Sequence, residues 1–401
     1  MTATLPTETR PGYKQTKLGW IPEEWEVVRL KRLIDLKSGQ HILAEDYSNG
    51  PIGTPYVTGP SDFCDKGLHI TKWTTNPKVV AQKGDLLITV KGSGCGRIAV
   101  SQIDRVAISR QLMAIKAKEG LDDRYMFYQI KRSERKLNHE SIGNLIPGLG
   151  RSEINGLRIP LPPLPEQQRI AAILGTWDRA IGQLEDLLAA KETQLKGLMQ
   201  RLLTGAVRLA GFEGAWEEVR LGQILKESKD VGLGADPSMR LTVKLNLKGV
   251  TNRAVRGTEV EGATIYYRRK AGQFIYGKQN LHKGALGLIP SEYDGYESSS
   301  DIPSFDFKAG YDPTYFVMYV SRPNFYEHLE VLATGTGSKR IKPRVLLKKT
   351  VNIPTLKEQK AIAGVLSAGQ TELQLLYQKL AGLREQQRGL MARLLTGAVR
   401  V

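Results

Sequence analysis

The chain has 401 residues, 41% of them hydrophobic, which is enough for at least two cores of ordinary domain size and argues against one large domain. It carries 58 Lys and Arg against 41 Asp and Glu, a formal net charge of +17. Such an excess favours a polyanionic partner, nucleic acid first, because binding releases condensed counterions. A basic protein that has no such partner is the alternative.

Cysteine and histidine usage excludes several other classes. The two cysteines, Cys64 and Cys95, are too few for a disulfide framework or a structural zinc site, so we expect two reduced thiols. The histidines, among them His41, His69 and His282, show no metal-ligand spacing. Residues 1–10 have no apolar signal core and no run of about 18 apolar residues follows, so a cytoplasmic protein is expected.

The first body of the chain, residues 1–165, contains short β-like runs punctuated by Gly and Pro, such as residues 86–91, and a helical stretch near Tyr125. The glycine-rich segment 92–96 precedes a returning strand rather than a helix, so it predicts a tight β connection and not a nucleotide loop. The second body, residues 208–357, has a run at 264–267 and a helical stretch near Tyr315. We expect two α+β domains.

Two motifs of the second body imitate catalytic ones. GQFIYGKQ at 272–279 has Gln279 where a phosphate-binding loop needs Ser or Thr for magnesium. DPTY at 312–315 lacks the proline at the third position of an amino-methyltransferase loop; Asp312, like Asp122 at the matching place, is explained as a helix N-cap. No set of Ser, His and Asp suggests a catalytic triad either, so we expect no catalytic site.

Residues 166–207 and 358–401 predict two long helices. Pro165, Glu166 and Glu358 suit their starts, and Gly205 and Gly397 suit their ends. Apolar residues recur at alternating steps of four and three for more than five heptads, which is typical of a coiled coil. The predicted seam consists of Ile170, Leu174, Trp177, Ile181, Leu184, Leu188, Leu195, Leu198, Leu202, Ile362, Leu366, Leu373, Leu376, Leu380, Leu383, Leu390 and Leu394.

The helices reveal an internal repeat. GLMQRLLTGAVR at 197–208 and GLMARLLTGAVR at 389–400 share eleven of twelve residues at an offset of 192. The repeat favours an antiparallel pair within one chain over a homodimeric coiled coil. About 38 residues at about 1.5 Å each form a rod of about 57 Å, longer than the roughly 34 Å between successive major-groove half-sites. Lys191, Gly369 and Gln387 interrupt the seam and either fix its register or face solvent.

The stretch PLPPLPEQQRIA and a leucine-rich helix that closes on RLLTGAVR, repeated after bodies of similar size, resemble the specificity subunit of type I restriction-modification systems. The resemblance implies a pseudo-twofold, non-catalytic subunit whose two target-recognition domains each read half of a bipartite, asymmetric DNA site. It also implies that the helix pair sets the spacer and docks two modification (methyltransferase) subunits. S-adenosylmethionine, ATP and Mg are then expected on those and on restriction (motor-nuclease) subunits, and no cofactor in this chain.

Base reading requires polar side chains on a rigid frame, with Arg or Lys for guanine and Asn or Gln for adenine. Polar residues in glycine-bounded loops are therefore the DNA-binding candidates: Thr58, Lys91, Ser93, Arg97, Arg110, Gln111 and Arg151 in the first body, and Lys278, Gln279, Asn280, His282, Lys283, Lys339, Arg340 and Lys342 in the second. Each is alternatively a surface residue or a phosphate contact. Residues 268–270 and 348–349 are interpreted as backbone clamps or surface charge.

Two other classes of protein remain as alternatives. A fused restriction enzyme and methyltransferase would need a catalytic region that this sequence lacks. An interaction scaffold that binds RNA through its charge would need no base-reading loops.

Overall fold

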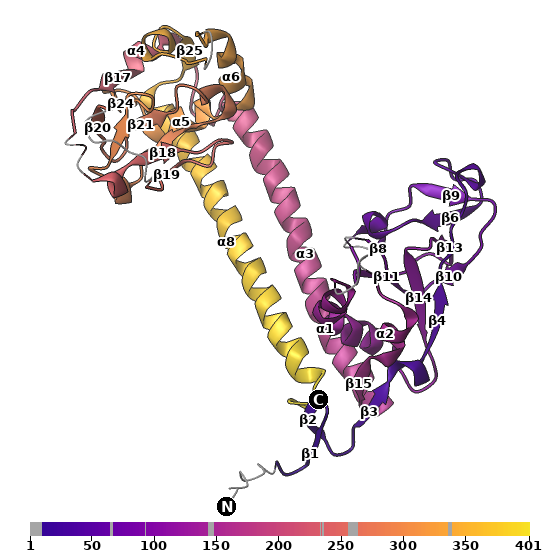
Figure 1. Cartoon of the computed structure of the whole chain (residues 1–401). Helices are drawn as coiled ribbons and strands as arrows, with labels where there is room; N and C mark the ends of the chain where they lie inside the picture. Colours follow the sequence, from indigo (N-terminus) through magenta and orange to yellow (C-terminus); the bar gives the residue numbers. More distant parts are fainter. Residues whose placement is uncertain are drawn as a thin grey trace, which may run out of the picture. The chain divides into compact units, whose positions relative to one another are not determined.

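The computed structural model describes residues 10–64, 67–92, 94–142, 148–232, 234, 236–255, 264–335 and 339–401. The chain folds into two compact units, of which unit 1 holds Met1–Asp186 with Gln378–Val401 and unit 2 holds Leu187–Tyr377. The long helices α3 (Leu164–Leu202) and α8 (Leu356–Leu394) each contribute one part to each unit (Figure 1).

Unit 1 contains two main β-sheets. The first is antiparallel, in the order β12-β11-β14-β4, and consists of β4 (Ile34–Ser38), β11 (Leu86–Thr89), β12 (Ile98–Val100) and β14 (Leu112–Ala117). The second has the order β10-β13-β6-β9-β5, with only β13 and β6 parallel. Its strands are β5 (Tyr47–Ser48), β6 (Thr54–Val57), β9 (Lys72–Thr74), β10 (Val80–Gln82) and β13 (Arg105–Ile108).

Shorter elements complete unit 1. Three two-stranded ladders pair β1 (Tyr13–Thr16) with β2 (Gly19–Pro22), β3 (Glu26–Arg29) with β15 (Arg158–Leu161), and β7 (Phe63–Cys64) with β8 (Gly67–Leu68). The helices are α1 (Asp123–Ile142), α2 (Arg151–Gly156) and the 3-10 turns η1 (Leu30–Arg32), η2 (Ala44–Asp46) and η3 (Pro60–Asp62). The predicted strand at 86–91 is β11, two residues shorter, and the segment after it connects β11 to its antiparallel partner β12, as predicted.

Unit 2 has one four-stranded antiparallel sheet in the order β17-β24-β21-β22, built from β17 (Leu225–Ser228), β21 (Phe274–Tyr276), β22 (Leu286–Leu288) and β24 (Ser304–Phe307). Two-stranded ladders pair β16 (Glu217–Arg220) with β25 (Thr350–Ile353), β18 (Leu241–Val243) with β19 (Val250–Asn252), and β20 (Tyr266–Arg268) with β23 (Glu297–Ser299). The predicted strand at 264–267 is β20, shifted by up to two residues.

The helices of unit 2 are short apart from its parts of α3 and α8. They are α4 (Leu221–Ile224), α5 (Pro313–Val320), α6 (Pro323–Tyr326), α7 (Pro343–Leu346) and the 3-10 turns η4 (Pro237–Met239), η5 (Leu281–Lys283), η6 (Ser291–Tyr293) and η7 (Glu327–Leu332). The chain is thus mixed α and β, as predicted. Among the described residues, we find no helix that combines the length and apolarity of a membrane span.

Asp122 and Asp312 cap helices, as the sequence predicts. The Asp122 carboxylate accepts a hydrogen bond from the Tyr125 backbone amide at 2.9 Å, and that of Asp312 accepts one from the Tyr315 amide at 2.8 Å. Each bond satisfies an amide that has no partner in the first turn of α1 or α5. The resemblance of 312–315 to a methyltransferase loop therefore has a structural cause.

The Glu-Gln pair at the start of each long helix ties that helix to its own unit. Gln167 accepts a hydrogen bond from the Asp122 amide at 2.9 Å and donates one to the Pro162 carbonyl at 2.9 Å. Gln359 makes the corresponding bond to the Asp312 amide at 2.8 Å. Because these amides begin α1 and α5, each glutamine fixes a long helix against the short helix of its unit.

Glu166 and Glu358 are buried carboxylates that are paired. Glu166 accepts hydrogen bonds from the Trp25 indole at 3.0 Å and from the Arg400 guanidinium at 2.6 and 3.0 Å. Glu358 accepts two from Arg208, at 2.6 and 2.7 Å. A bidentate arginine offsets the cost of burying each carboxylate. These contacts hold the segment after one long helix against the start of the other.

The tips of both long helices belong to the cores of the units. Leu394 of α8 and the next residue, Leu395, pack with Trp25 in the core of unit 1, and Leu202 of α3 and the next residue, Leu203, pack in the core of unit 2. Gly205 and Gly397 follow these tips with φ values of 72° and 71°, the left-handed conformation predicted for a helix end. The apolar residues near the ends of the long helices therefore pack in the cores of the two units. Only the seam residues between those ends pair one helix with the other.

Of the predicted seam residues, Leu198 is the most open to solvent, at 37% exposed. It lines a hollow together with Val365 and Gly369 of α8, so it lies on the side of α3 that faces the other long helix. The other predicted seam residues are buried or half-buried.

Candidate nucleic-acid interface

Three connections meet in unit 1 at the ends of β6, β11 and β13. The Ser109 hydroxyl donates to the Thr58 carbonyl at 2.6 Å, which joins the segment after β13 to the segment after β6. The Val90 amide donates to the Gln111 carbonyl at 2.8 Å, which joins the segment after β11 to both. We call residues 58–62, 90–92, 94–97 and 109–111 the unit 1 loop cluster; of the described DNA-binding candidates of the first body, it contains all except Arg151.

Glycines allow these connections to approach closely. A Cβ atom on Gly59 would lie 2.6 Å from the Gln111 side-chain oxygen, and one on Gly94 would lie 2.5 Å from the ring of Pro60. Sequence reasoning selected the polar neighbours of these glycines and missed the glycines themselves. Their signal was present, because Gly-Pro followed by Asp at 59–62 is a turn pattern.

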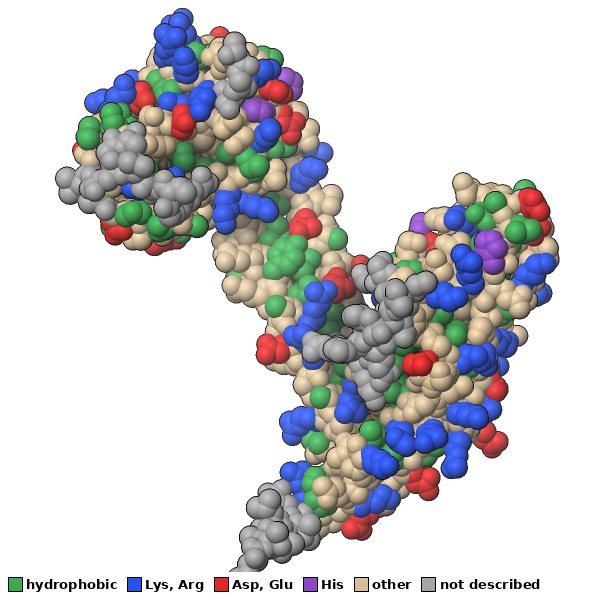
Figure 2. Space-filling model, viewed as in Figure 1, with side chains coloured by type: hydrophobic (Ala, Val, Ile, Leu, Met, Phe, Trp, Pro, Cys, Tyr) green, Lys and Arg blue, Asp and Glu red, His purple; other side chains and the backbone are tan. Residues whose placement is uncertain are grey.

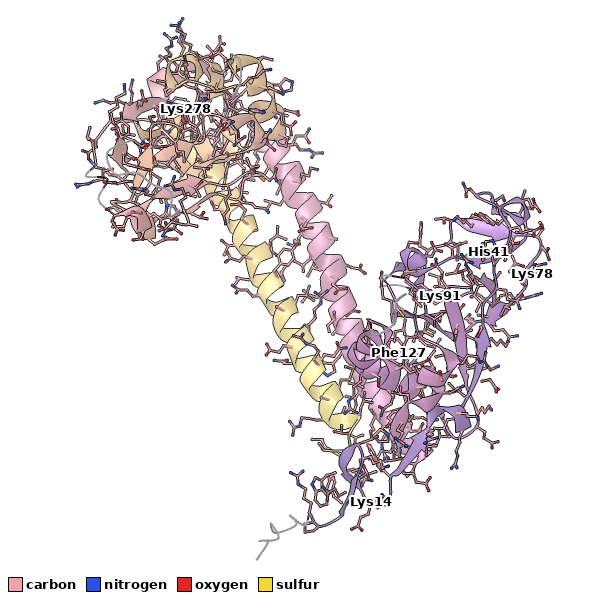
Figure 3. The ribbon with its side chains drawn as sticks, in the orientation of Figure 1. Lys14, His41, Lys78, Lys91, Phe127 and Lys278 are labelled. Atoms are coloured by element: carbon pink, nitrogen blue, oxygen red, sulfur yellow. The ribbon has the colours of Figure 1, made fainter. Side chains whose placement is uncertain are left out.

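The candidates of unit 1 differ in what their side chains already bind. Lys91, Arg110 and Gln111 are exposed on the unit 1 loop cluster, and Lys91 is labelled in Figure 3. Arg97 is exposed but donates to the Pro60 carbonyl at 3.3 Å. Ser93 lies outside the described residues.

Thr58 and Arg151 have structural partners. The hydroxyl and amide of Thr58 donate to the Asp62 carboxylate at 2.9 and 2.7 Å, which closes the turn after β6. The Arg151 guanidinium donates to the Ser38 hydroxyl at 3.0 Å and the Leu36 carbonyl at 2.7 Å, which holds α2 against β4. Both side chains shape the interface more directly than they can read bases.

The DNA-binding candidates of unit 2 also lie close together. The Lys278 carbonyl accepts from the Ile341 amide at 2.8 Å, and the Lys278 amide donates to the Asp301 carbonyl at 2.9 Å. Arg340 contacts the Asp301 carboxylate at 3.2 Å. Residues 277–285 therefore lie beside residues 299–303 and 339–342, and we call these three segments the unit 2 loop cluster.

Several side chains of the unit 2 loop cluster are open to solvent. Gln279, Lys283, Lys339 and Lys342 are exposed, whereas Lys278 (Figure 3), Asn280 and Arg340 are half-buried. His282 is half-buried, and its Nδ1 atom is enclosed without a hydrogen-bond partner among the described residues. Lysine and arginine side chains occur across both units (Figure 2).

Arg269 was interpreted from the sequence as a backbone clamp or surface charge, and this is wrong. The residue is 1% exposed, and its guanidinium donates to the hydroxyls of Ser298 at 2.7 Å and Ser304 at 3.0 Å. It also donates to the carbonyls of Ser228 at 3.1 Å and Ile302 at 3.2 Å. Burial lowers the pKa of Arg269 to about 10. This side chain fixes the segment that carries Asp301 of the unit 2 loop cluster.

The remaining sequence motifs that resemble catalytic or ligand-binding ones have structural explanations. The GQFIYGKQ segment forms strand β21, and only the three-residue turn η5 follows it, where a phosphate loop would need a helix. The described residues hold no cluster of three His, Cys, Asp or Glu side chains suited to a metal ion. No disulfide bond joins the two described cysteines, Cys64 and Cys95.

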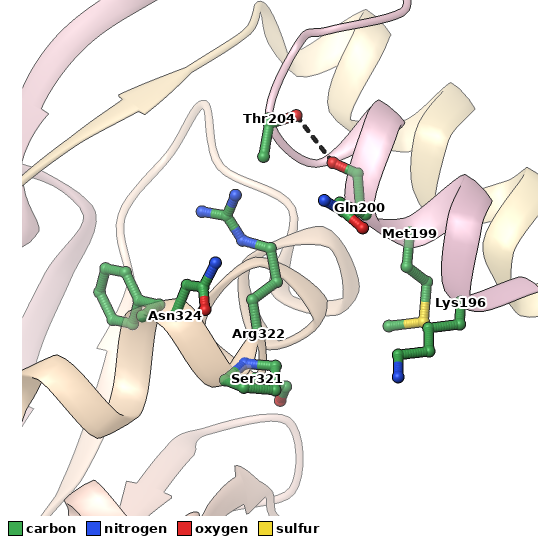
Figure 4. A pocket seen from close by; sticks show the side chains of 9 residues that line it. Lys196, Met199, Gln200, Thr204, Ser321, Arg322 and Asn324 are labelled. Atoms are coloured by element: carbon green, nitrogen blue, oxygen red, sulfur yellow. Dashed lines mark hydrogen bonds between the residues drawn. The ribbon is translucent and has the colours of Figure 1, made fainter.

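Unit 2 has a cleft of about 440 Å³ between the end of α3 and helix α6 (Figure 4). Its lining includes Met199, Gln200, Arg322 and Phe325. The Arg322 guanidinium lies 3.9 Å from the centre of the Tyr319 ring and donates to the Tyr319 carbonyl at 2.9 Å. The described residues that line the cleft include no carboxylate, histidine or cysteine.

Comparison with known sequences gives a consistent family. Residues 22–190 match the family described as the type I restriction modification DNA specificity domain. The chain is 24% identical to the type I restriction enzyme MjaVIII specificity subunit of Methanocaldococcus jannaschii, over 95% of this chain and 94% of that protein. It is 29% identical to the putative MjaX specificity subunit of the same organism, over 49% of this chain and 47% of that protein.

Solved structures share the fold. The crystal structure of the type I restriction-modification S subunit from M. genitalium matches with a TM-score of 0.61 and 15% identity, over 96% of this chain and 99% of that one. A structure described as the basis of complex assembly and conformational transition of the type I R-M system matches with a TM-score of 0.57 and 15% identity, over 94% of this chain and 99% of that one.

Basic side chains gathered on the loops of both units are an electrostatic footprint of nucleic-acid binding. The chain is similar over most of its length to a specificity subunit of a type I restriction enzyme, and its residues 22–190 match the DNA specificity domain of those systems. The matched domain is a recognition domain, and the similar proteins are specificity subunits.

Proposed function

We propose that the two units each read one half of a bipartite, asymmetric DNA site. The supporting observation is that one segment of each loop cluster follows the second strand of a four-stranded sheet, β11 or β21, and that the two clusters present different side chains. Unit 1 offers Lys91, Arg110 and Gln111, and unit 2 offers Gln279 and Lys283. Different donors and acceptors on corresponding loops select different bases.

We further propose that the chain is a pseudo-twofold internal repeat, with target-recognition domains at 1–165 and 208–357 and helices at 166–207 and 358–401. The sheet orders β12-β11-β14-β4 and β22-β21-β24-β17 support this, because they correspond strand for strand in chain order. The long helices support it as well, since each has 39 residues and the two begin 192 residues apart.

In this proposal the helix pair sets the spacer of the DNA site and docks two modification subunits, which restriction subunits join in the cytoplasm. An uninterrupted helix of 39 residues is about 58 Å long at a rise of about 1.5 Å per residue. Apolar side chains on both helices support docking, since Leu187, Leu375 and Tyr377 are 43%, 59% and 48% exposed.

Methylome sequencing tests the reading function. Cells that carry the cognate modification subunit are sequenced with this chain present and with it deleted. We expect one split, asymmetric, adenine-methylated motif to disappear on deletion and to return on complementation. No change in any split motif, with the chain shown to be expressed, would refute the proposal.

Single substitutions then test which unit reads which half of the DNA motif. Gln111→Ala should relax base preference in one half of the motif only, and Gln279→Ala in the other half only, each by about 1–3 kcal/mol of discrimination at one position. Gln82→Ala, at an exposed glutamine outside both loop clusters, is the matched control and should leave both halves unchanged. If both glutamine variants lose base preference in the same half of the motif, the proposal that each unit reads a different half is contradicted.

Lengthening both helices tests the spacer. One heptad inserted after Asp186 in α3 and another after Tyr377 in α8, at the limits of the units, adds about 10 Å to each helix. We expect the methylated motif to keep both halves and to gain about three base pairs of spacer. An unchanged spacer in an active complex would exclude the helix pair as the determinant.

A further inference from the structure

The tips of α3 and α8 are chemically interchangeable. Met199 and Leu202 of α3 pack in the core of unit 2, and Met391 and Leu394, which stand 192 residues later, pack in the core of unit 1. Arg208 and Arg400 bind Glu358 and Glu166 in the same bidentate way. Nothing in these tips prevents the α3 of one molecule from taking the place of α8 in another.

The middle parts of the helices differ where they meet. In unit 1, the Gln387 amide of α8 donates to the Asp178 carboxylate of α3 at 2.7 Å, and Arg384 pairs with Glu185. Asp178 also accepts a short hydrogen bond from the Tyr128 hydroxyl of α1. The contacts of Gln387 and Arg384 each join a residue of α8 to a residue of a different type on α3. These contacts would therefore be lost if two copies of the same helix paired.

In unit 2, different residues meet at the corresponding places. Lys191 of α3 pairs with Glu372 of α8 at 2.8 Å. The Tyr377 hydroxyl of α8 donates to the Glu192 carboxylate of α3. Each of the three interruptions predicted in the seam, Lys191, Gly369 and Gln387, therefore faces the opposite helix and contributes to its register.

Gly369 forms a steric notch for Leu195. A Cβ atom on Gly369 would lie 2.9 Å from Leu195 Cδ1, closer than such atoms approach. The residue of α3 that stands 192 positions before Gly369 is Trp177. If two α3 helices paired in the same antiparallel register, the Leu195 of each copy would meet an indole instead of a glycine, so either this leucine would have to leave its position or the helices would have to move apart.

Charge opposes the same α3 self-pair. By the offset of 192, Glu192 would replace Arg384 opposite Glu185, so two carboxylates would face each other at two symmetric places. Leu195 would replace Gln387 opposite Asp178, which would leave a carboxylate facing a leucine. A pair of α8 helices would instead leave Gly369 opposite Gln387, without the leucine that fills the notch.

We infer that the helix surfaces select an unlike partner: the first half of the chain, ending in α3, binds the second half, ending in α8, and rejects another first half. The preference acts between copies as well as within one chain, so exchange of halves between molecules still leaves one unit 1 and one unit 2 in each pair. It is a property of the helix surfaces and holds whatever the units bind.

Cleavage of the full chain tests this pairing. A protease site is inserted between the exposed Ala210 and Gly211, and the purified protein is cut, unfolded in urea and diluted back to native buffer. Native mass spectrometry then counts pairs by mass. We expect more than about nine tenths of the pairs to contain one of each half, whereas halves without a preference would leave about half of the pairs symmetric. The statistical mixture would overturn the inference.

A designed variant tests whether two α3 helices can be made to pair with each other. With Trp177→Gly and Glu185→Arg, the notch for Leu195 and an opposite charge for Glu192 both lie on α3. We expect symmetric pairs of first halves to rise at least about tenfold over the wild type. The control, Gln183→Gly with Ala190→Arg, places the same residue types at exposed positions of α3 and should leave the pairing unchanged. Equal pairing in variant and control would overturn the inference.

Melting of the uncut chain provides a second measurement that needs no refolding. Gly369→Trp should lower the melting temperature by about 5 °C relative to Gly382→Trp, because Gly382 has no atom within 4 Å of a built Cβ. Equal melting temperatures of the two variants would show that Gly369 does not contribute to the pairing of the helices and would overturn the inference.

Discussion

Replacement of Arg269 by methionine removes the guanidinium that fixes one segment of the unit 2 loop cluster. Four acceptors lose a donor: the hydroxyls of Ser298 and Ser304 and the carbonyls of Ser228 and Ile302. The methionine side chain fills a similar length of buried space but donates nothing.

The loss of stability caused by this replacement depends on the hydrogen bonds that the four acceptors keep. The Ser298 hydroxyl still donates to the Ile302 carbonyl at 2.6 Å, and the Ser304 hydroxyl still donates to Gln273 at 2.8 Å. Bonds to a charged donor contribute about 1.5–3 kcal/mol each, but the folded state no longer carries the cost of burying the charge. We expect the free energy of unfolding of unit 2 to fall by about 3 kcal/mol.

Hydrogen exchange of β21 and β24 in the full chain measures unit 2 separately from unit 1. The matched control is Arg268→Met, because Arg268 is the exposed neighbour on the same strand and its loss should change stability by less than about 0.5 kcal/mol. If Arg269→Met behaves like Arg268→Met, the guanidinium does not hold the loop and the reasoning fails.

Two further predictions concern the helices. Gly389→Ala should raise the free energy of unfolding by about 1 kcal/mol, because a Cβ there meets no atom within 4 Å and alanine favours the helix. Gly397→Ala should lower it by at least about 2 kcal/mol, because its φ is +71° and its Cβ would lie 2.4 Å from Pro22; equal melting curves would contradict both. Trp25→Phe should cost about 1 kcal/mol through loss of the bond to Glu166. In a double-mutant cycle the cost should shrink in a Glu166→Leu background, which has no acceptor, and an equal cost in both backgrounds would contradict the role of this bond.

Features that depend on local sequence were predictable. The caps at Asp122 and Asp312, the helix ends at Gly205 and Gly397 and the connection after β11 follow from short patterns with a physical cause. The glycine-bounded segments after β6, β11 and β21 lie outside the strands, since glycine and polar residues mark turns. Whether the selected side chains touch bases stays a prediction.

Features that depend on distant residues were not predictable. Arg269 lies in a run of three charged residues that resembles surface, and its burial results from partners such as Ser298 and Ser304 about 30 residues away. The parallel pairing of β6 with β13 joins strands that are separated by several others in the chain, and no local pattern encodes it.

The packing of the α8 tip has a consequence for synthesis on the ribosome. The core of unit 1 contains Leu394 and Leu395, and the Leu395 carbonyl accepts a hydrogen bond from the Gln129 side chain. These residues are translated after the whole of unit 2, so a nascent unit 1 exposes the apolar surface around Trp25 until translation reaches them. A chain truncated before Leu394 keeps that surface exposed, which marks the incomplete product for chaperones and proteases.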